Sequence, residues 1–267
     1  MRDHNEDSIG MDARIGLVAL ADGMGGYNAG EVASGIAVAT LMADLKAALS
    51  HHEPQLIGQE DADPPGVTLL RAGIGRANAS ILLAARAQRE YAGMGTTLVA
   101  ALFRDDRVAV GHVGDSRLYR LRGDNLEQVT RDHSLLEQQI ERGLITREQA
   151  RRSKNKNLVT RALGIDDNVA AEIHVHGVCC GDLYLLCSDG LSDMVPEEDM
   201  HLALCSLRDK LQLAANHLVR MANDNGGRDN ISVILVRVLQ PFPPPVGFLA
   251  KIKSGLRRAT GITQWRS

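Results

Sequence analysis

Residues 15–26 read Ile-Gly-Leu-Val-Ala-Leu-Ala-Asp-Gly-Met-Gly-Gly, an apolar run that ends in an aspartate and a glycine-rich turn. The run from Ile15 to Ala21 is typical of a buried strand, so Asp22 is predicted to stand where that strand ends and a turn begins. The same order recurs at residues 183–190, where Leu-Tyr-Leu-Leu-Cys precedes Ser-Asp-Gly. Carboxylates from several such strand ends, gathered at one sheet edge, would form an all-oxygen pocket of the kind that binds Mg²⁺ or Mn²⁺.

Two more short motifs carry an aspartate, Gly-Asp-Ser-Arg at 114–117 and Arg-Asp-Asn at 228–230. Taken singly, each motif is most often only a turn, because Asp bonds its own backbone and Gly tolerates positive φ. Four of them, with Glu6 and Asp7 upstream, favour a metal site, since a cluster of unpaired aspartates repels itself unless cations are bound. Two hard ions bridged by one carboxylate could clamp a phosphate and activate a water, so phosphoryl transfer would need no protein nucleophile.

Composition and the remaining motifs weigh against several other classes of protein. The 267 residues, 44% of them hydrophobic, suffice for one large domain or, at a stretch, two small ones. A net charge of -3 argues against a dominant nucleic-acid role. No apolar stretch is expected to span a bilayer, and the first residues lack an apolar signal core. Residues 22–26 are followed by no Gly-Lys-Ser/Thr, so they are no Walker motif, and a Gly-x-Ser-x-Gly hydrolase elbow is missing.

The cysteines indicate the redox compartment. Their spacing fits neither a disulfide framework nor a zinc site, so we expect reduced, packed thiols in a cytoplasmic protein. The four are Cys179, Cys180, Cys187 and Cys205.

Hydrophobic spacing predicts strands grouped between helix pairs, with most strands joined by hairpins. That arrangement favours an α+β fold with antiparallel sheets. Strands are expected at 14–21, 96–104, 107–113, 116–122, 126–130, 171–178, 183–187 and 231–239, and helices at 31–49, 67–89, 197–207 and 210–223. A polar segment with two short helical stretches is expected at 132–157.

Seven segments, in this order along the chain, resemble the metal-dependent serine/threonine protein phosphatases of type 2C, the PPM family, and specifically its compact bacterial members. Any one segment is weak, but all of them in order, from Arg2 to about Leu239, are highly specific. They are Arg2-Asp3-His4-Asn5-Glu6-Asp7-Ser8, Ala21-Asp22-Gly23-Met24-Gly25-Gly26, Gly93-Met94-Gly95-Thr96-Thr97, Val113-Gly114-Asp115-Ser116-Arg117, Thr130-Arg131-Asp132-His133-Ser134, Cys187-Ser188-Asp189-Gly190-Leu191 and Arg228-Asp229-Asn230-Ile231-Ser232.

The resemblance implies a four-layer sandwich of two antiparallel β-sheets flanked by helix pairs, with two core Mn²⁺ or Mg²⁺ ions and a weaker third ion at one end. By position, Asp22 would bridge both core ions and the Gly23 carbonyl would ligate one of them. The other residues implied for the metals are Asp189 and Asp229 for one core ion, Glu6 with support from Asp7 for the other, and Asp115 with Asp193 for the third.

Substrate contacts are implied in two places. Arg2 matches the arginine that holds the substrate phosphate. A variable flap at 132–157 would face the substrate, with Asp132, His133 and Ser134 at its start. Met24 stands where many eukaryotic relatives have a histidine that is proposed to protonate the leaving group.

The implied activity is hydrolysis of phosphoserine and phosphothreonine in proteins by a hydroxide that bridges the two ions. The expected partners are phosphoproteins that a bacterial Ser/Thr kinase modifies. The alternative is a non-catalytic or single-partner phosphoprotein-binding regulator with the same fold. Intact Asp22, Asp189 and Asp229 argue against it, because a dead site has no reason to keep a costly acidic cluster.

Three regions are expected along the chain: a phosphatase domain at 1–239, a proline-rich linker at 240–247 and a basic tail at 248–267. The prolines end the domain because they cannot continue a strand. The tail mixes basic and apolar residues and could contact a membrane surface or a partner, although a frayed tail is the favoured interpretation.

Overall fold

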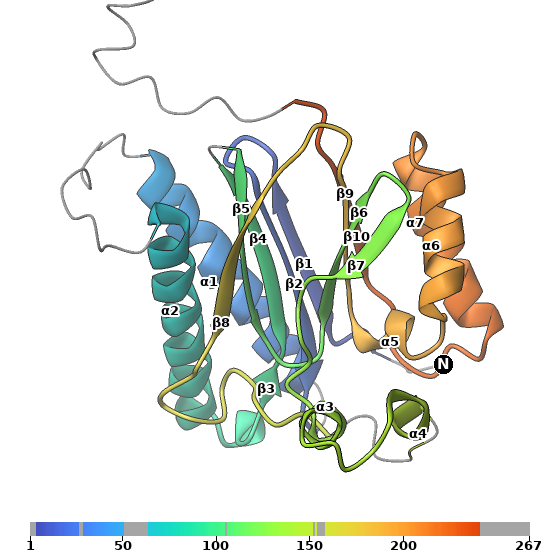
Figure 1. Ribbon diagram of the computed structural model, residues 1–267. Helices are drawn as coiled ribbons and strands as arrows, with labels where there is room; N and C mark the ends of the chain where they lie inside the picture. The colour runs from blue at the N-terminus through green and yellow to red at the C-terminus, as the bar shows by residue number, and fades with distance from the viewer. Residues whose placement is uncertain are drawn as a thin grey trace, which may run out of the picture.

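A computed structural model describes residues 4–26, 29–50, 64–104, 106–151, 153 and 158–240 of this chain. Two antiparallel sheets face each other, and a pair of helices covers the outer face of each, as Figure 1 shows. The predicted α+β sandwich of four layers is therefore confirmed. Arg2, the linker from residue 241 and the basic tail lie outside the described residues.

The first sheet has six strands. Its order is β1-β2-β4-β5-β8, and β3 pairs with the end of β2. Helices α1 (Ala29–Ser50) and α2 (Pro65–Ala87) pack together on its outer face. The strands are β1 (Asp7–Asp12), β2 (Leu17–Met24), β3 (Gly95–Thr96), β4 (Leu98–Arg104), β5 (Arg107–Val113) and β8 (Glu172–Gly177).

The second sheet has four strands in the order β10-β9-β6-β7. Helices α6 (Glu197–Ser206) and α7 (Leu211–Asp224) lie outside it (Figure 1). The strands are β6 (Arg117–Arg122), β7 (Asn125–Gln128), β9 (Leu183–Cys187) and β10 (Val233–Arg237).

Alternation along the strands separates the core into layers. On β4, Val99 and Phe103 face the second sheet, whereas Leu98 and Leu102 face α1 and α2. The ring of Phe103 meets that of Tyr184 on β9 edge-on, with centroids 5.0 Å apart, and this pair joins the two sheets. Most of the other buried side chains are aliphatic, as the low aromatic content predicts.

Helix α1 differs from one expectation. Its 22 residues, with a hydropathy of 1.5, are long and apolar enough to cross a membrane by length and composition. In this fold the helix packs against α2, β1 and β2, and Ala33, Ala37 and Leu41 are buried in the core. A core helix therefore accounts for its apolar character.

Short elements cluster at the lower end of the sandwich in Figure 1. They include the flap helices α3 (Leu135–Glu141) and α4 (Arg147–Arg151), and the single turn α5 (Asp189–Ser192) directly after β9. The two helical stretches predicted for the flap are thus confirmed, while residues 152 and 154–157 of the flap lie outside the described part. A 3₁₀ turn, η1 (Arg89–Tyr91), follows α2.

The structure differs from the sequence predictions for two strands and for two cysteines. Strand β2 continues through Asp22 to Met24, because Gly23 and Met24 pair with Thr96 and Gly95 of β3. Strand β1 was not predicted, since its sequence is half polar and it lies at the sheet edge, where Ile9 and Met11 are exposed. All four cysteines are free, as expected, but Cys179 and Cys180 are exposed rather than packed.

Candidate metal centre and active site

Four strand ends bring the predicted carboxylates to one end of the sandwich. Asp7 opens β1 and is the register partner of Asp22 near the end of β2. Asp189 follows β9 as the first residue of α5, and Asp115 follows β5. Asp229 precedes β10, which pairs with β9, so its loop lies beside α5.

The backbone of Asp22 is held on both sides. Its N–H donates to Thr97 Oγ1 at 3.0 Å, and its carbonyl accepts from Thr97 N at 2.9 Å. The same carbonyl accepts from Thr96 Oγ1 at 2.9 Å. Because the peptide groups are fixed, the direction of the Asp22 carboxylate is set by β3 and the start of β4 rather than by a flexible turn.

A second network ties the start of the chain to the loop before β10. Ser188 Oγ donates to Asp7 Oδ2 at 2.9 Å and accepts from Ser232 N at 3.0 Å. Asn230 Oδ1 accepts from Glu6 N at 3.0 Å. Sequence analysis assigned no role to the Ser188 and Asn230 side chains, although both stand inside the matched motifs.

Two glycines allow these segments to meet. A Cβ on Gly23 would lie 2.1 Å from the carbonyl oxygen of Gly30, and a Cβ on Gly190 would lie 2.0 Å from that of Asn230. The first approach places α1 against the end of β2, and the second places α5 against the loop that carries Asp229. A methyl group at either position would push apart backbones that hold predicted ligands.

The carboxyl groups interact strongly with one another. Burial, then the charges of Asp189, Asp7 and Asp115, raises the pKa of Asp22 well above its usual range. Burial, then Asp229 and Asp193, raises the pKa of Asp189 to about 6. Burial likewise raises the pKa of Asp7. The cluster is therefore costly as a set of bare anions.

The donor set fits hard divalent cations. Asp22 lies within hydrogen-bonding reach of the carboxyls of both Asp7 and Asp189. Asp7 Oδ1 and Asp189 Oδ1 are buried and receive no hydrogen bond from the described residues. Buried carboxylate oxygens without donors are suitable ligands for Mg²⁺ or Mn²⁺, and no sulfur or nitrogen atom competes among the predicted ligands.

Asp115 lines a small cavity of about 20 Å³ next to Asp189, which is room for a single water or ion. Burial, then Asp189 and Asp132, raises the pKa of Asp115 to about 7. The cavity is lined by Asp115, Arg117, Asp132, Asp189, Ser192 and Asp193. The predicted pair Asp115 and Asp193 is thus brought together. A larger cavity, about 500 Å³, lies between α6 and α7 and shares no lining residue with it.

Arg117 in that cavity was missed by sequence analysis. Its Nη2 donates to Asp132 Oδ2 at 2.6 Å and its Nε lies 3.0 Å from both Asp132 oxygens. Its Nη1 donates to the Tyr119 hydroxyl at 3.1 Å. The Thr-Arg-Asp-His-Ser motif could not reveal this partner, because the arginine comes from β6, which is separated from the motif by β7.

The other two flap residues are also anchored. His133 and Ser134 are both 6% exposed. Ser134 caps α3 by accepting from Glu137 N at 3.2 Å, and His133 N donates to the carbonyl of Gly114 at 2.9 Å. These bonds place both residues at the base of the flap, and their part in substrate binding stays a prediction.

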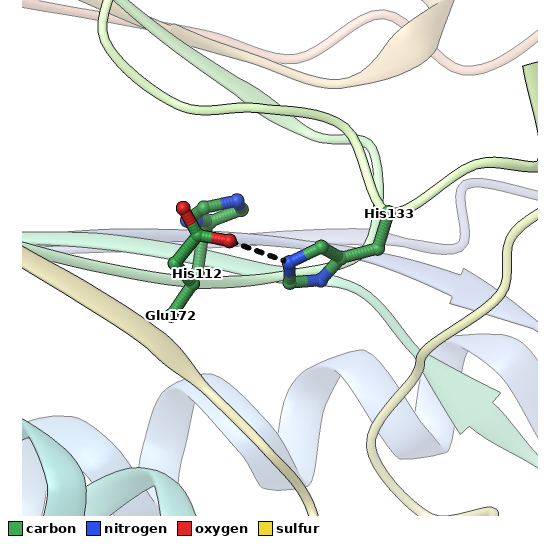
Figure 2. A group of neighbouring side chains, drawn as sticks. All are labelled: His112, His133 and Glu172. Atoms are coloured by element: carbon green, nitrogen blue, oxygen red, sulfur yellow. Dashed lines mark hydrogen bonds and ion pairs between the residues drawn. The ribbon is translucent and has the colours of Figure 1, made fainter. Parts of the chain in front are cut away.

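A second polar cluster, drawn in Figure 2, joins His112 of β5, His133 and Glu172 of β8. His112 is packed, with 1% of its surface exposed. Of the two histidines on β8, His174 is 52% exposed, whereas His176 is half-buried.

A family model described as protein phosphatase 2C matches residues 2–223. This chain belongs to the protein phosphatase 2C family. The match spans the acidic residues described above except Asp229, and it includes the flap.

Named relatives of this phosphatase come from bacteria. The serine/threonine phosphatase stp of Listeria innocua is 40% identical over 239 residues, which cover 88% of this chain and 91% of that protein. The serine/threonine protein phosphatase PstP of Mycobacterium tuberculosis is 38% identical over 242 residues, 90% of this chain but 43% of that protein.

Solved structures agree with this assignment. The crystal structure of the M. tuberculosis serine/threonine phosphatase PstP/Ppp has a TM-score of 0.79 and 36% identity, and the match covers 90% of this chain and 94% of that one. The catalytic domain of PstP in complex with two manganese ions has a TM-score of 0.77 and 34% identity, over 90% and 94% of the chains. Both the sequence and the fold of this chain are thus those of a protein phosphatase.

Proposed function

We propose that this enzyme hydrolyses phosphoserine and phosphothreonine in proteins and uses two Mn²⁺ or Mg²⁺ ions to do so. The observation that carries the proposal is the convergence of Asp7, Asp22, Asp189 and Asp229 at one end of a protein phosphatase 2C fold. A non-catalytic binding role is disfavoured, since mutually repelling carboxylates are retained only at a cost that a bound cation offsets.

The proposed ligands are those that the family resemblance implies, and their convergence at one end of the fold supports them. Asp22 would bridge the ions, with the Gly23 carbonyl, Asp189, Asp229 and Glu6 completing the set. When bound, the ions supply Lewis acidity to phosphate oxygens and lower the pKa of a water molecule. Asp7 accepts the Ser188 hydroxyl on Oδ2, while its Oδ1 is buried and accepts no hydrogen bond from the described residues. Asp7 would therefore help to orient the neighbouring metal ligands.

Neither side chain beside Asp189 is suited to act as a nucleophile. Cys187 is fully buried, and burial raises the pKa of its thiol to about 12, so the thiolate is not formed at neutral pH. Ser188 Oγ is buried, donates to Asp7 and accepts from Ser232 N. These observations support direct attack by water rather than a phosphoenzyme.

The proposed partners are phosphoproteins modified by a bacterial Ser/Thr kinase, in the cytoplasm. The bacterial origin of the named relatives supports this proposal. Arg2 is proposed to hold the substrate phosphate, because its guanidinium fork matches phosphate oxygens.

Metal removal tests the function. With p-nitrophenyl phosphate and a phosphothreonine peptide as substrates, we expect turnover with Mn²⁺, none in excess EDTA, and recovery when Mn²⁺ is added back. The proposal would be contradicted if Mn²⁺ failed to promote phosphate release from the phosphopeptide, or if turnover stayed complete in EDTA. Thermal unfolding with and without Mn²⁺ is the accompanying control, because an ion that binds only the native state raises the melting temperature.

Asp115 is proposed to hold the weaker third ion with Asp193. Asp115→Ala is expected to lower kcat roughly tenfold, in the range for residues that support a metal site. The two core ions should stay bound, because Asp115 follows β5, a different strand from those next to Asp22, Asp189 and Asp229. Calorimetric titration with Mn²⁺ separates these outcomes: loss of both tight sites in the variant would place Asp115 in the core instead.

A further inference from the structure

We propose that His133 is a positioning residue, which aims the Asp115 carboxylate into the active site by holding both peptide groups of Gly114. The inference rests on the proposed function, since it assigns His133 to the part of the site that Asp115 forms. It differs from the role in substrate binding that the family pattern implied for His133.

His133 contacts Gly114 through two hydrogen bonds. His133 N donates to the Gly114 carbonyl at 2.9 Å, and Gly114 N donates to His133 Nδ1 at 3.2 Å. Gly114 has a φ of 102°, and a Cβ there would lie 2.6 Å from the Thr97 side chain. The turn thus has a backbone conformation that other residues adopt only with strain, and His133 bonds the residue directly before Asp115.

The opposite side of the turn is also held. Thr97 Oγ1 and Ser116 Oγ lie 2.7 Å apart, and Thr97 also binds the backbone of Asp22. The two neighbours of Asp115 are therefore held from opposite sides, Ser116 by Thr97 and Gly114 by His133. Carboxylates proposed to hold an ion depend on such supporting bonds, whose loss typically costs about 10–100-fold in affinity or activity.

The surroundings of the His133 imidazole fix both its tautomer and its orientation. Because Gly114 N–H points at Nδ1, the neutral ring carries its proton on Nε2, which lies 3.3 Å from Glu172 Oε2, as Figure 2 shows. Glu172 Oε1 lies 2.7 Å from His174 Nε2. The ring of His112 stacks on His133 with centroids 4.7 Å apart, and its Nε2 lies 2.7 Å from the Arg131 carbonyl. The contact with Glu172 and the stacking on His112 hold the imidazole in one orientation, and His174 does not touch the ring of His133.

The same cluster could be read as a metal site, since one ligand atom from each of His112, His133 and Glu172 lies within 4.8 Å of the others. Coordination through His133 Nε2 would move the ring proton to Nδ1, where it would face Gly114 N–H. Arg161 Nη1, a cation, also lies 3.3 Å from Nε2. The geometry therefore favours a hydrogen-bonded support over an ion.

His133 also connects the turn before Asp115 to the flap. The His133 carbonyl accepts from Thr160 N at 2.7 Å, and Ser134, the next residue, caps α3. One residue thus fixes both the start of the flap and the turn before Asp115. Displacement of its side chain should disturb the Asp115 site while the bonds of its main chain persist.

Two isosteric variants separate the bonds. The amide of His133→Asn places an acceptor near the Nδ1 position and keeps the Gly114 bond, whereas that of His133→Gln reaches the Nε2 position and loses it. We expect His133→Gln to lower kcat on p-nitrophenyl phosphate roughly tenfold, and His133→Asn to stay within about twofold of wild type. The Gly114 amide should exchange rapidly with deuterium in the Gln variant and slowly in the Asn variant and the wild type. Equal exchange rates in all three proteins would overturn the contact.

A double-mutant cycle with Asp115→Ala tests the route to activity. If His133 acts through Asp115, the Gln variant should cost less than about twofold in kcat in the Asp115→Ala background. Additive losses would overturn the positioning role. His174→Ala is the matched control, because it alters an exposed histidine beside Glu172 and should leave kcat unchanged. Wild-type dependence on Mn²⁺, measured in the same assay, tests the proposed function separately from His133.

Discussion

Replacement of Asp22 by asparagine is expected to lower kcat/KM roughly a thousandfold on both p-nitrophenyl phosphate and a phosphothreonine peptide. Loss of a supporting residue alone typically costs about 10–100-fold, and Asp22 is the proposed bridging ligand. The amide has the same shape but lacks the charge that would bind two cations. Initial rates at saturating Mn²⁺ give the comparison, and a variant with more than a tenth of wild-type activity would contradict the bridging role.

The same variant should be at least as stable as the wild type without metal. Asp22 is repelled by Asp189, Asp7 and Asp115, so removal of its charge relieves the cluster. With Mn²⁺ the order should reverse, because the wild type gains more from the bound ions. Asp167→Asn is a suitable control. Its side chain is 73% exposed and pairs with Arg86 on the surface, so activity should not change.

Gly190→Ala is expected to destabilise the protein and to lower kcat roughly a hundredfold. Its new Cβ would lie 2.0 Å from the backbone oxygen of Asn230. Because that oxygen belongs to the backbone, rotation of a side chain cannot relieve the clash. Overpacking of this kind typically costs about 1–3 kcal/mol. Helix α5 and the loop before β10 must then move apart, and so must Asp189 and Asp229. A displacement near 1 Å in an active site can cost about a hundredfold in rate.

Thermal unfolding and steady-state kinetics measure the two effects. Each kcal/mol should lower the melting temperature by roughly 2–4 °C in a protein of this size. Gly75→Ala is the matched control. Gly75 lies on the exposed side of α2, where an added methyl group would have no other atom within 4 Å, so alanine should preserve activity and raise helix stability slightly. Wild-type kinetics in Gly190→Ala would show that α5 and the loop tolerate separation.

Several elements could be predicted from sequence because their signals are local. The apolar spacing of 31–49 and 67–89 indicated α1 and α2, and the largely apolar run at 107–113 indicated β5. Strand β1 could not be found this way. Its fit depends on pairing with β2, and pairing at a sheet edge leaves little hydrophobic pattern in the strand itself.

The acidic residues of the site were also predictable, because each stands in a short motif and the motifs occur in family order. Their supports were not. Ser188 binds Asp7 across 181 positions and Asn230 binds Glu6 across 224, while Thr97 reaches Asp22 across 75. Such hydrogen bonds depend on distance in the folded chain, and nothing local distinguishes these serine, threonine and asparagine side chains from those of ordinary turns.

The sequence by itself therefore determined the family, the helix pairs, most of the strands and the carboxylates of the site, since composition, periodicity and motif order are properties of neighbouring residues. Only the tertiary structure decided that β2 runs through Asp22, that Arg117 binds Asp132, and that His133 holds Gly114. The physical reason is that hydrogen bonds act over about 3 Å. They join whichever groups the sheets bring together, however far apart those groups lie along the chain.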